Sequence, residues 1–291
     1  MVCRKDFEAI GTHWCIDLPE ALDAQRVECV LKKIHDRIEE FDRAYSRFRV
    51  DSIVTQMSQQ SGRFAFPADS ASMMTFYRRL YDLTDGAVTP LIGNVLSDSG
   101  YDAAYSLQQK SMMVPKAWDE VIRFHGESIE TSEPVLFDFG AAGKGYIVDI
   151  ISDLIEAEGI NSYCVDAGGD MRYRSVVDEP LRVGLEHPID TKQVIGVASI
   201  VNRSICGSAM NRRAWGDFHH VIDPRTLTSP KHVLAVWVVA ETTMIADGLT
   251  TALMFATPHV LLQEFDFEYA IVHADLSLSV SSSFPAEFFV T

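Results

Sequence analysis

Several features that define common protein classes are scarce or missing in this chain of 291 residues. Its five cysteines are odd in number, and no two of them stand in Cys-x-x-Cys spacing. This pattern argues against a disulfide-stapled scaffold or a zinc knuckle and fits free thiols in a reducing compartment. No apolar run approaches the length of a membrane span, so we predict no membrane segment.

Positive charge is also scarce. The chain has 25 Lys and Arg against 41 Asp and Glu, a formal net charge of −16. Such a chain is a poor partner for nucleic acid or for an anionic membrane surface. A phosphate ligand would therefore have to be held locally, by backbone N–H groups, a few cations or a metal ion. Hydrophobic residues make up 47% of the chain, which is enough for a sizeable core.

The first residues, MVCRKDFEAIG, contain no apolar stretch of the kind found in signal peptides. As written, the sequence predicts a cytoplasmic protein. A chain trimmed of an export leader would read the same way, so both locations stay open. We find no linker, low-complexity tract or short-period repeat, and we predict one compact unit over residues 1–291 with two lobes.

Helical and strand patterns are interleaved, but several strands follow one another without a helix between them. This order predicts an α+β fold with largely antiparallel sheets and flanking helices. Apolar residues at helical spacing predict a first helix within 19–46. Further helices are predicted over 70–86, 146–159 and 242–258, the last capped by Thr242 or Thr243. Strands are predicted over 8–18, 121–130, 134–140, 162–175, 181–188, 193–204 and 232–241, while 87–102 and 214–230 read as irregular.

A small-residue segment, FDFGAAGKGYIVDII (137–151), joins a predicted strand to a predicted helix. Its glycines permit a close backbone approach to a ligand, the helix N-terminus suits an anion, and Lys144 adds a cation. It matches neither the Walker A motif nor the dinucleotide-binding glycine motif. From these residues alone, a phosphate loop and a tight strand-to-helix turn are both open.

Other local signals are individually weak. Asp247 and Thr251 stand four residues apart, so on a helix they share a face and offer Mg²⁺ two oxygen ligands. Asp247 at a helix start is equally explained by the helix dipole. His220 offers an imidazole for proton transfer, or is an ordinary loop histidine. Arg47 and Arg49 suggest either a phosphate clamp or a solvated basic patch.

Taken in order, these segments resemble the FAD:protein FMN transferase (ApbE) family. The motifs that carry the resemblance are YSRFRVDS, TDGAVTP-IG, FDFGAAGKGYIVD, VDAGGDMR with HHVIDPRT, and ADGLTTAL, which follow one another from Ile10 to the last helix. The family implies an enzyme that uses Mg²⁺ to split FAD, attaches FMN through a phosphoester to a Thr or Ser of an acceptor flavoprotein, and releases AMP.

The resemblance also implies a set of site residues. His220 and Asp247 would be catalytic, and a metal would be held by the Ala141 carbonyl, Asp247 and Thr251, with Thr250 a weaker candidate ligand. FAD would contact Ile10, Phe48, Ala87, Val88, Thr89, Asp138, Lys144 and His220. On this basis the loop at 137–145 is a pyrophosphate and metal loop.

Two other functions stay open. One is a Mg²⁺-dependent FAD diphosphatase, which would release FMN and AMP with water as acceptor. The other is a flavin-binding module without catalysis, because a tryptophan, a carboxylate and a tyrosine of the family pattern are replaced here. The chain has no Asp-x-Ser/Thr-Gly-Ala/Ser-Thr acceptor motif of its own, so it reads as the enzyme and not as the flavinylated partner.

Overall fold

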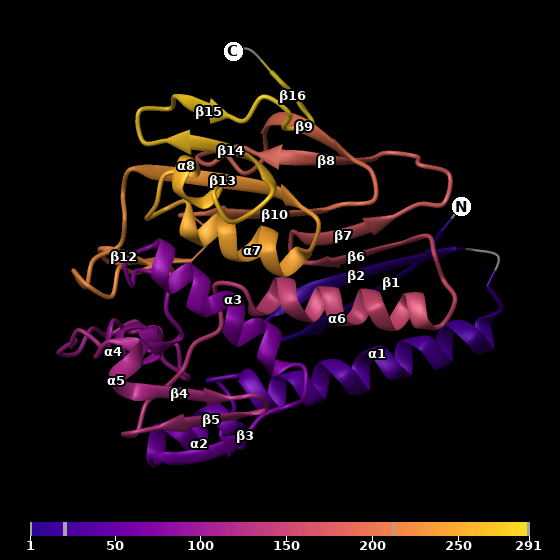
Figure 1. Cartoon of the computed structure of the whole chain (residues 1–291). Helices are drawn as coiled ribbons and strands as arrows, with labels where there is room; N and C mark the ends of the chain where they lie inside the picture. Colours follow the sequence, from indigo (N-terminus) through magenta and orange to yellow (C-terminus); the bar gives the residue numbers. More distant parts are fainter. Residues whose placement is uncertain (1, 20–21, 212, 290–291) are drawn as a thin grey trace.

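The computed structural model describes residues 2–19, 22–211 and 213–289 (Figure 1). The fold is α+β, and every strand pairing within the described residues is antiparallel, as the sequence predicted. Among these residues, no helix is both long enough and apolar enough to cross a membrane.

An eight-stranded sheet organises the molecule. Its strands, in spatial order, are β1 (Val2–Ala9), β2 (Thr12–Pro19), β6 (Tyr163–Ala167), β7 (Asp170–Arg174), β10 (Ser204–Ala209), β13 (Val233–Ala240), β14 (Phe267–His273) and β15 (Leu278–Val280). In β2 alternate residues are buried, among them Trp14, Ile16 and Leu18, because only one face of this strand meets the core. In β13 nearly every residue is buried, because both faces of the sheet are covered there.

Helices cover one face of this sheet (Figure 1). The main ones are α1 (Ala24–Tyr45), α3 (Ser70–Leu83), α6 (Gly143–Ala157) and α7 (Thr243–Ala252). Val27, Ile34, Ile38 and Phe41 of α1 are buried in the main core, which confirms the amphipathic pattern. The shorter helices are α2 (Ile53–Gln59), the 3-10 helix η1 (Pro90–Ile92), α4 (Gly93–Asp98), α5 (Trp118–Val121) and α8 (Pro258–Leu261).

Smaller sheets complete the structure. A three-stranded sheet of β8 (Leu181–Glu186), β9 (Val194–Ile200) and β16 (Ala286–Phe288) supplies residues to a second core, together with β10, β13 and β14. The others are β3 (Gly62–Ala65), β4 (Ile122–His125) and β5 (Ser128–Thr131), and the hairpin of β11 (Ala214–Trp215) and β12 (Phe218–His219).

Three predicted strands proved to be hairpins. The segment 8–18 turns at Ile10 and Gly11 between β1 and β2, and the segment 121–130 forms β4 and β5. The segment 162–175 forms β6 and β7, with a turn at Gly168 and Gly169. Both glycines have positive φ, which a reversal of the chain requires and a continuous strand does not.

Other segments differ from prediction because tertiary partners decide their shape. Residues 134–140 form no strand: Val135 N–H donates to the Met57 carbonyl and Asp138 N–H to the Pro90 carbonyl (2.9 and 2.8 Å). The segment 87–102, expected to be irregular, contains η1 and α4, and the irregular segment 214–230 contains β11 and β12. Two predicted elements end early: 193–204 breaks after β9, and 242–258 ends as a helix at Ala252. The Thr242 cap is confirmed, since its side chain accepts from Ile245 N–H.

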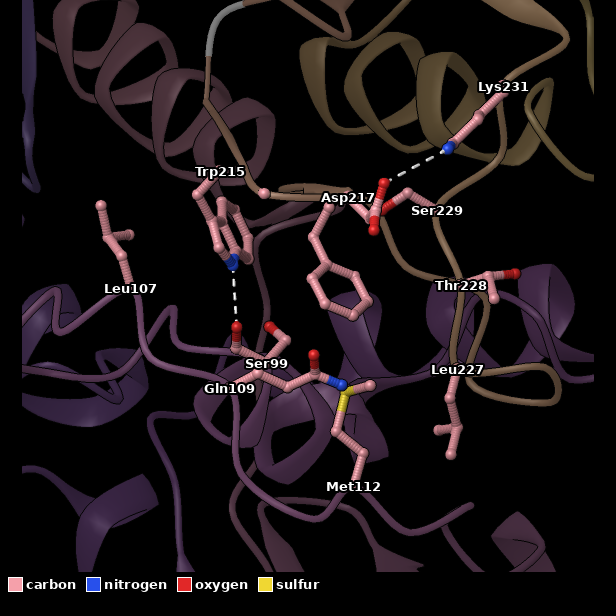
Figure 2. A pocket seen from close by; sticks show the side chains of 12 residues that line it. Ser99, Leu107, Gln109, Met112, Trp215, Asp217, Leu227, Thr228, Ser229 and Lys231 are labelled. Atoms are coloured by element: carbon pink, nitrogen blue, oxygen red, sulfur yellow. Dashed lines mark hydrogen bonds and ion pairs between the residues drawn. The ribbon is translucent and has the colours of Figure 1, made fainter.

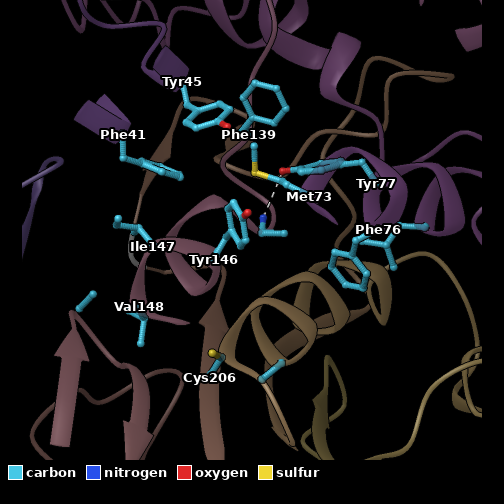
Figure 3. Packing of buried hydrophobic residues seen from close by; sticks show 14 of the residues in the cluster. Phe41, Tyr45, Met73, Phe76, Tyr77, Phe139, Tyr146, Ile147, Val148 and Cys206 are labelled. Carbon is cyan, nitrogen blue, oxygen red and sulfur yellow. Dashed lines mark hydrogen bonds between the residues drawn. The ribbon is translucent and has the colours of Figure 1, made fainter. Parts of the chain in front are cut away.

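An aromatic cluster packs beneath the segment that joins residue 137 to α6 (Figure 3). The Phe139 ring makes edge-on contacts with Tyr45 and Tyr77, with ring centroids 5.4 and 5.6 Å apart. The Tyr77 hydroxyl accepts a hydrogen bond from Ala142 N–H at 3.2 Å, and burial raises the pKa of Tyr77 well above its usual value. This core therefore fixes the backbone that follows Phe139.

Candidate active site

All of the site residues carried over from the family, except the weaker candidate Thr250, line one cavity of about 730 Å³. They come from loops and helix ends that are far apart in the sequence. The structure brings together Ile10, Phe48, Ala87, Val88, Thr89, Asp138, Ala141, Lys144, His220, Asp247 and Thr251. Thr250 is outside this lining; it is buried, and its hydroxyl donates to the Asp247 carbonyl at 2.7 Å.

The segment 138–143 forms one wall of the cavity. Asp138 Oδ1 accepts the Gly140 N–H at 2.7 Å, which bends the backbone just before α6. Ala142 is held from below by Tyr77. The Ala141 carbonyl accepts no backbone hydrogen bond from the described chain, so its oxygen is available to a ligand.

Helices α6 and α7 meet at the deepest charged part of the cavity lining. Gly145 N–H of α6 donates to Asp247 Oδ2 of α7 at 2.9 Å. Lys144 forms an ion pair with the buried Asp170, and its Nζ is 3.8 Å from Asp247 Oδ1. Burial, reinforced by the nearby Asp170, raises the pKa of Asp247 to about 7. Burial opposes the charge on Lys144, but Asp170 and Asp247 outweigh it and raise the pKa of Lys144.

A second carboxylate fixes α7 against α6. Asp149 of α6 accepts the N–H groups of Thr243 and Met244, both at 2.8 Å, and so caps the first turn of α7. Arg172 Nη1 approaches the same carboxylate at 3.0 Å. The position of Asp247 is therefore set by hydrogen bonds from both helices.

The oxygens near Asp247 suit a hard cation. Asp247, Ala141 and Thr251 all line the cavity and bring a carboxylate, a main-chain carbonyl and a hydroxyl to it, and the Thr251 hydroxyl makes no hydrogen bond in the described chain. Oxygen donors of these kinds are the ones that Mg²⁺ takes in proteins. Within residues 2–19, 22–211 and 213–289, no group of three or more His, Cys, Asp or Glu side chains forms a metal cluster. A metal here would depend on mixed oxygen donors.

The opposite wall is aromatic and centres on Phe48, which is 37% exposed. Its ring stacks with Tyr105, with centroids 5.5 Å apart and planes within 10°, and meets Tyr101 edge-on. The Arg47 guanidinium lies 4.2 Å from the centre of the Phe48 ring. A flat, electron-rich surface of this kind is suited to a planar ring system.

The suggestion that Arg47 and Arg49 clamp a phosphate, or form a solvated basic patch, is not what the structure shows. Arg47 is buried and donates to Asp138 Oδ2 at 2.5 Å. Arg49 is engaged by the carboxylates of Glu39, Asp42 and Asp51. Both arginines are neutralised by acidic neighbours, which the local sequence could not reveal for Arg47 because Asp138 is 91 residues away.

Two turns present the remaining predicted contacts. Ile10 has φ of +50° between β1 and β2, a conformation rarely taken by a β-branched residue, and it lines the cavity. Ala87, Val88 and Thr89 follow the turn at 85–86. The Thr89 hydroxyl oxygen accepts the Leu91 N–H at 3.2 Å and caps η1, so this side chain already has a structural partner.

The adjacent histidines have different environments. The ring of His219 is fixed by the Pro230 carbonyl at 2.8 Å and by the Val221 N–H at 3.2 Å. The ring of His220 lines the cavity, and its Nδ1 is buried without a hydrogen-bond partner in the described chain. Burial, with His219 and Arg213 nearby, lowers the pKa of His220 to about 3. His220 is therefore neutral near pH 7.

Replacing His220 by asparagine is expected to flatten the pH dependence of stability between about pH 3 and 6.5. In that window the unfolded chain binds the proton and the folded chain does not, so wild-type stability falls as the pH drops. One proton corresponds to at most about 1.4 kcal/mol per pH unit. Urea unfolding of both proteins at several pH values measures the slopes, and equal slopes would contradict a buried neutral His220.

Sequence reasoning missed several residues at this site. Asp170 binds Lys144, and Tyr101, Tyr105 and Arg213 also line the cavity. The signal for Asp170 was present, because it is a carboxylate directly after a Gly-Gly turn. Tyr101 and Tyr105 lie in a stretch without regular periodicity, and nothing local indicated that they face Phe48.

A second hollow of about 800 Å³ is lined by residues between 99 and 112 and between 215 and 231 (Figure 2). None of the predicted site residues lines it. Its Trp215 Nε1 donates to the Ser99 carbonyl at 2.8 Å, and the Trp215 ring centroid is 5.5 Å from that of Tyr101, which lines the first cavity. At the other end, Lys231 Nζ is 3.9 Å from Asp217.

Comparison with known proteins gives a consistent picture. The FAD:protein FMN transferase of Escherichia coli K12 is 27% identical over 272 residues, covering 86% of this chain and 77% of that protein. The Vibrio cholerae protein of the same name is 25% identical over 256 residues, covering 82% and 76%. The chain thus aligns with most of each relative.

Solved structures share the fold. The ApbE protein of Thermotoga maritima superposes with a TM-score of 0.86 at 21% identity, over 99% of this chain and 100% of that one. The flavin transferase ApbE of Vibrio cholerae gives a TM-score of 0.80 at 22% identity, over 98% of both chains. The model of the ApbE family matches residues 10–268, which is most of the sequence. The chain therefore belongs to the ApbE family.

Proposed function

We propose that this protein is an FAD:protein FMN transferase. The observation that carries the proposal is the single cavity in which an aromatic wall, a half-buried lysine, a neutral histidine and a set of oxygen donors meet. Its lining runs from Ile10 to Phe255, so we also propose that the whole chain works as one unit. The curated relatives named above carry this activity in their names.

In the proposed reaction, a Ser or Thr hydroxyl of an acceptor protein attacks the FMN phosphorus of FAD. A new P–O bond to the acceptor forms, the anhydride P–O bond breaks, and AMP leaves. His220 is neutral in the ligand-free chain, and the negative charge of a bound diphosphate would raise its low pKa, so that it accepts the proton of the attacking hydroxyl. Lys144 remains a cation and lowers the negative potential around the diphosphate. Phe48 offers a face to the isoalloxazine ring.

Asp247, Thr251 and the Ala141 carbonyl would hold Mg²⁺. The ion supplies charge neutralisation to the diphosphate when bound. Gly145 N–H keeps the Asp247 carboxylate turned toward the start of α6, and Lys144 shares the other carboxylate oxygen. These contacts leave Asp247 held in place before any ligand binds.

AMP release is expected to require FAD, Mg²⁺ and a flavoprotein domain with an acceptor Ser or Thr. Chelation with EDTA is expected to stop AMP release, and excess Mg²⁺ is expected to restore it. Without the ion, the negative charge of the diphosphate is not neutralised. The assay follows AMP by chromatography and protein-bound flavin by fluorescence after denaturation. An acceptor whose hydroxyl residue is replaced by alanine is the control.

The same assay separates the alternatives. Free FMN and AMP produced equally with and without acceptor would support an FAD diphosphatase and contradict transfer. If FAD is bound but stays intact under every condition, both enzymatic activities are contradicted and the protein is a flavin-binding module.

A further inference from the structure

Arg47 contacts the Asp138 carboxylate, the Tyr101 residue and the Phe48 ring at the same time. Its Nε donates to Asp138 Oδ2 at 2.5 Å, and its Nη1 donates to the Tyr101 carbonyl at 2.7 Å. The guanidinium carbon is 4.2 Å from the centre of the Phe48 ring and 4.8 Å from that of Tyr101. A planar guanidinium with a fork of donors can make all of these contacts at once, and a lysine cannot.

Arg47 is buried, so its contacts are shielded from solvent and its ion pair is little weakened by water. Only 2% of its side chain and 13% of the Asp138 side chain are exposed, so the charge pair is shielded from solvent. The third nitrogen, Nη2, is buried and has no hydrogen-bond partner in the described chain. A buried guanidinium nitrogen without a partner is uncommon in a folded protein, and this one belongs to a residue that lines the cavity.

Asp138 is engaged on both carboxylate oxygens. Oδ2 accepts from Arg47, and Oδ1 accepts the Gly140 N–H that shapes the segment leading to Ala141. Through this carboxylate, Arg47 joins the turn after α1, which carries Phe48, to the loop that carries the Ala141 carbonyl. One ion pair thus links the ring-binding side of the cavity to the diphosphate side.

We propose that Arg47 is the positioning residue that holds Phe48 and Asp138 in the arrangement that receives the flavin ring of FAD. This inference rests on the proposed function and deepens it. Arg47 takes no part in the transfer of the phosphoryl group. It sets how tightly and in what orientation the ring is bound.

The test uses Arg47→Met, which keeps much of the aliphatic volume and removes the charge and the donors. We expect the Kd and the KM for FAD to rise roughly tenfold or more, the scale of a lost charge-assisted hydrogen bond. We expect kcat at saturating FAD to stay within about threefold, because His220, Lys144 and Asp247 are untouched. Kd is measured by flavin fluorescence in EDTA, where FAD stays intact, and the visible absorption band reports the surroundings of the ring.

Further variants distinguish a loss of FAD positioning from general damage to the fold. Arg47→Lys keeps the charge and is expected to recover part of the FAD affinity. The double variant Arg47→Met/Asp138→Asn removes both charges, leaves no unpaired carboxylate, and is expected to bind FAD no more weakly than Arg47→Met. Arg43→Met is the matched control, since Arg43 is 63% exposed and pairs only with Glu39 in the described chain. Its Kd and KM are expected to match the wild type.

The outcomes distinguish this inference from the proposed function. The positioning role alone would be overturned if the wild type binds FAD and Arg47→Met binds it equally tightly and with the same absorption band. A fall in kcat with no change in KM would overturn it as well. Wild type that binds no FAD would overturn the proposed function and this inference together.

Discussion

Replacing Asp247 by alanine is expected to abolish FMN transfer in a chain that still folds. Asp247 is the one carboxylate in the proposed metal set, and removing even an outer-shell partner of a metal site commonly costs about 10–100-fold in affinity or activity. Loss of a direct ligand should therefore cost more than about 100-fold in kcat/KM. The assay is acceptor-dependent AMP release at saturating Mg²⁺.

Asp247→Asn separates charge from packing. The amide oxygen of asparagine can still accept the Gly145 N–H, but the negative charge is gone. Because burial and Asp170 raise the pKa of Asp247 from 3.8 to about 7, the wild-type chain loses stability as the pH rises through this window, and the loss is complete above pH 7. Asp247→Asn is thus expected to lose activity while its Tm at pH 8 equals or exceeds that of the wild type. Retained activity in Asp247→Asn would contradict a role for the carboxylate charge.

Replacing Gly145 by alanine is expected to disrupt both the fold and the site. Helices α6 and α7 approach so closely there that an added Cβ would overlap the Thr243 carbonyl and lie 2.7 Å from Asp247 Cβ. Both obstacles belong to a capped helix, so neither can rotate away. Overpacking of this kind typically costs 1–3 kcal/mol, and we expect roughly 3 kcal/mol here because one obstacle is backbone. Urea unfolding measures the change, and the transfer assay measures the displacement of Asp247.

Gly143→Ala is the control on the same helix. A Cβ on Gly143 would lie 3.3 Å from Phe139 Cβ, a tight contact that small shifts can relieve, and alanine favours helix over glycine. Its unfolding free energy is expected to stay within about 1 kcal/mol of the wild type. A Gly145→Ala chain as stable and active as Gly143→Ala would show that the two helices do not need to be this close.

The elements that sequence reasoning predicted well are those in which local rules and tertiary contacts agree. The apolar spacing of α1 and the Thr242 cap of α7 are local patterns, and the structure keeps both. The fold class followed from the order of the elements. The site residues followed from motifs spread over the chain, and they do share one cavity.

The failures have one physical cause, which is that distant partners decide the shape of short segments. Residues 134–140 have strand composition, yet their N–H groups bond to Met57 and Pro90. Arg47 stands in a polar, exposed-looking stretch, yet it is buried by Asp138 and Tyr101. The partnership of Lys144 with Asp170 joins a helix to a strand, and no spacing rule relates the two.

The central claim is that this cavity moves FMN from FAD to a protein hydroxyl, and intact mass spectrometry of the acceptor tests it most directly. The purified chain is incubated with FAD, Mg²⁺ and an acceptor domain, alongside the acceptor lacking its hydroxyl residue. The account predicts that the acceptor gains the mass of one FMN minus water, that the hydroxyl-free acceptor gains nothing, and that Asp247→Ala gives no gain with either. An unchanged acceptor mass while FAD is consumed would contradict the account.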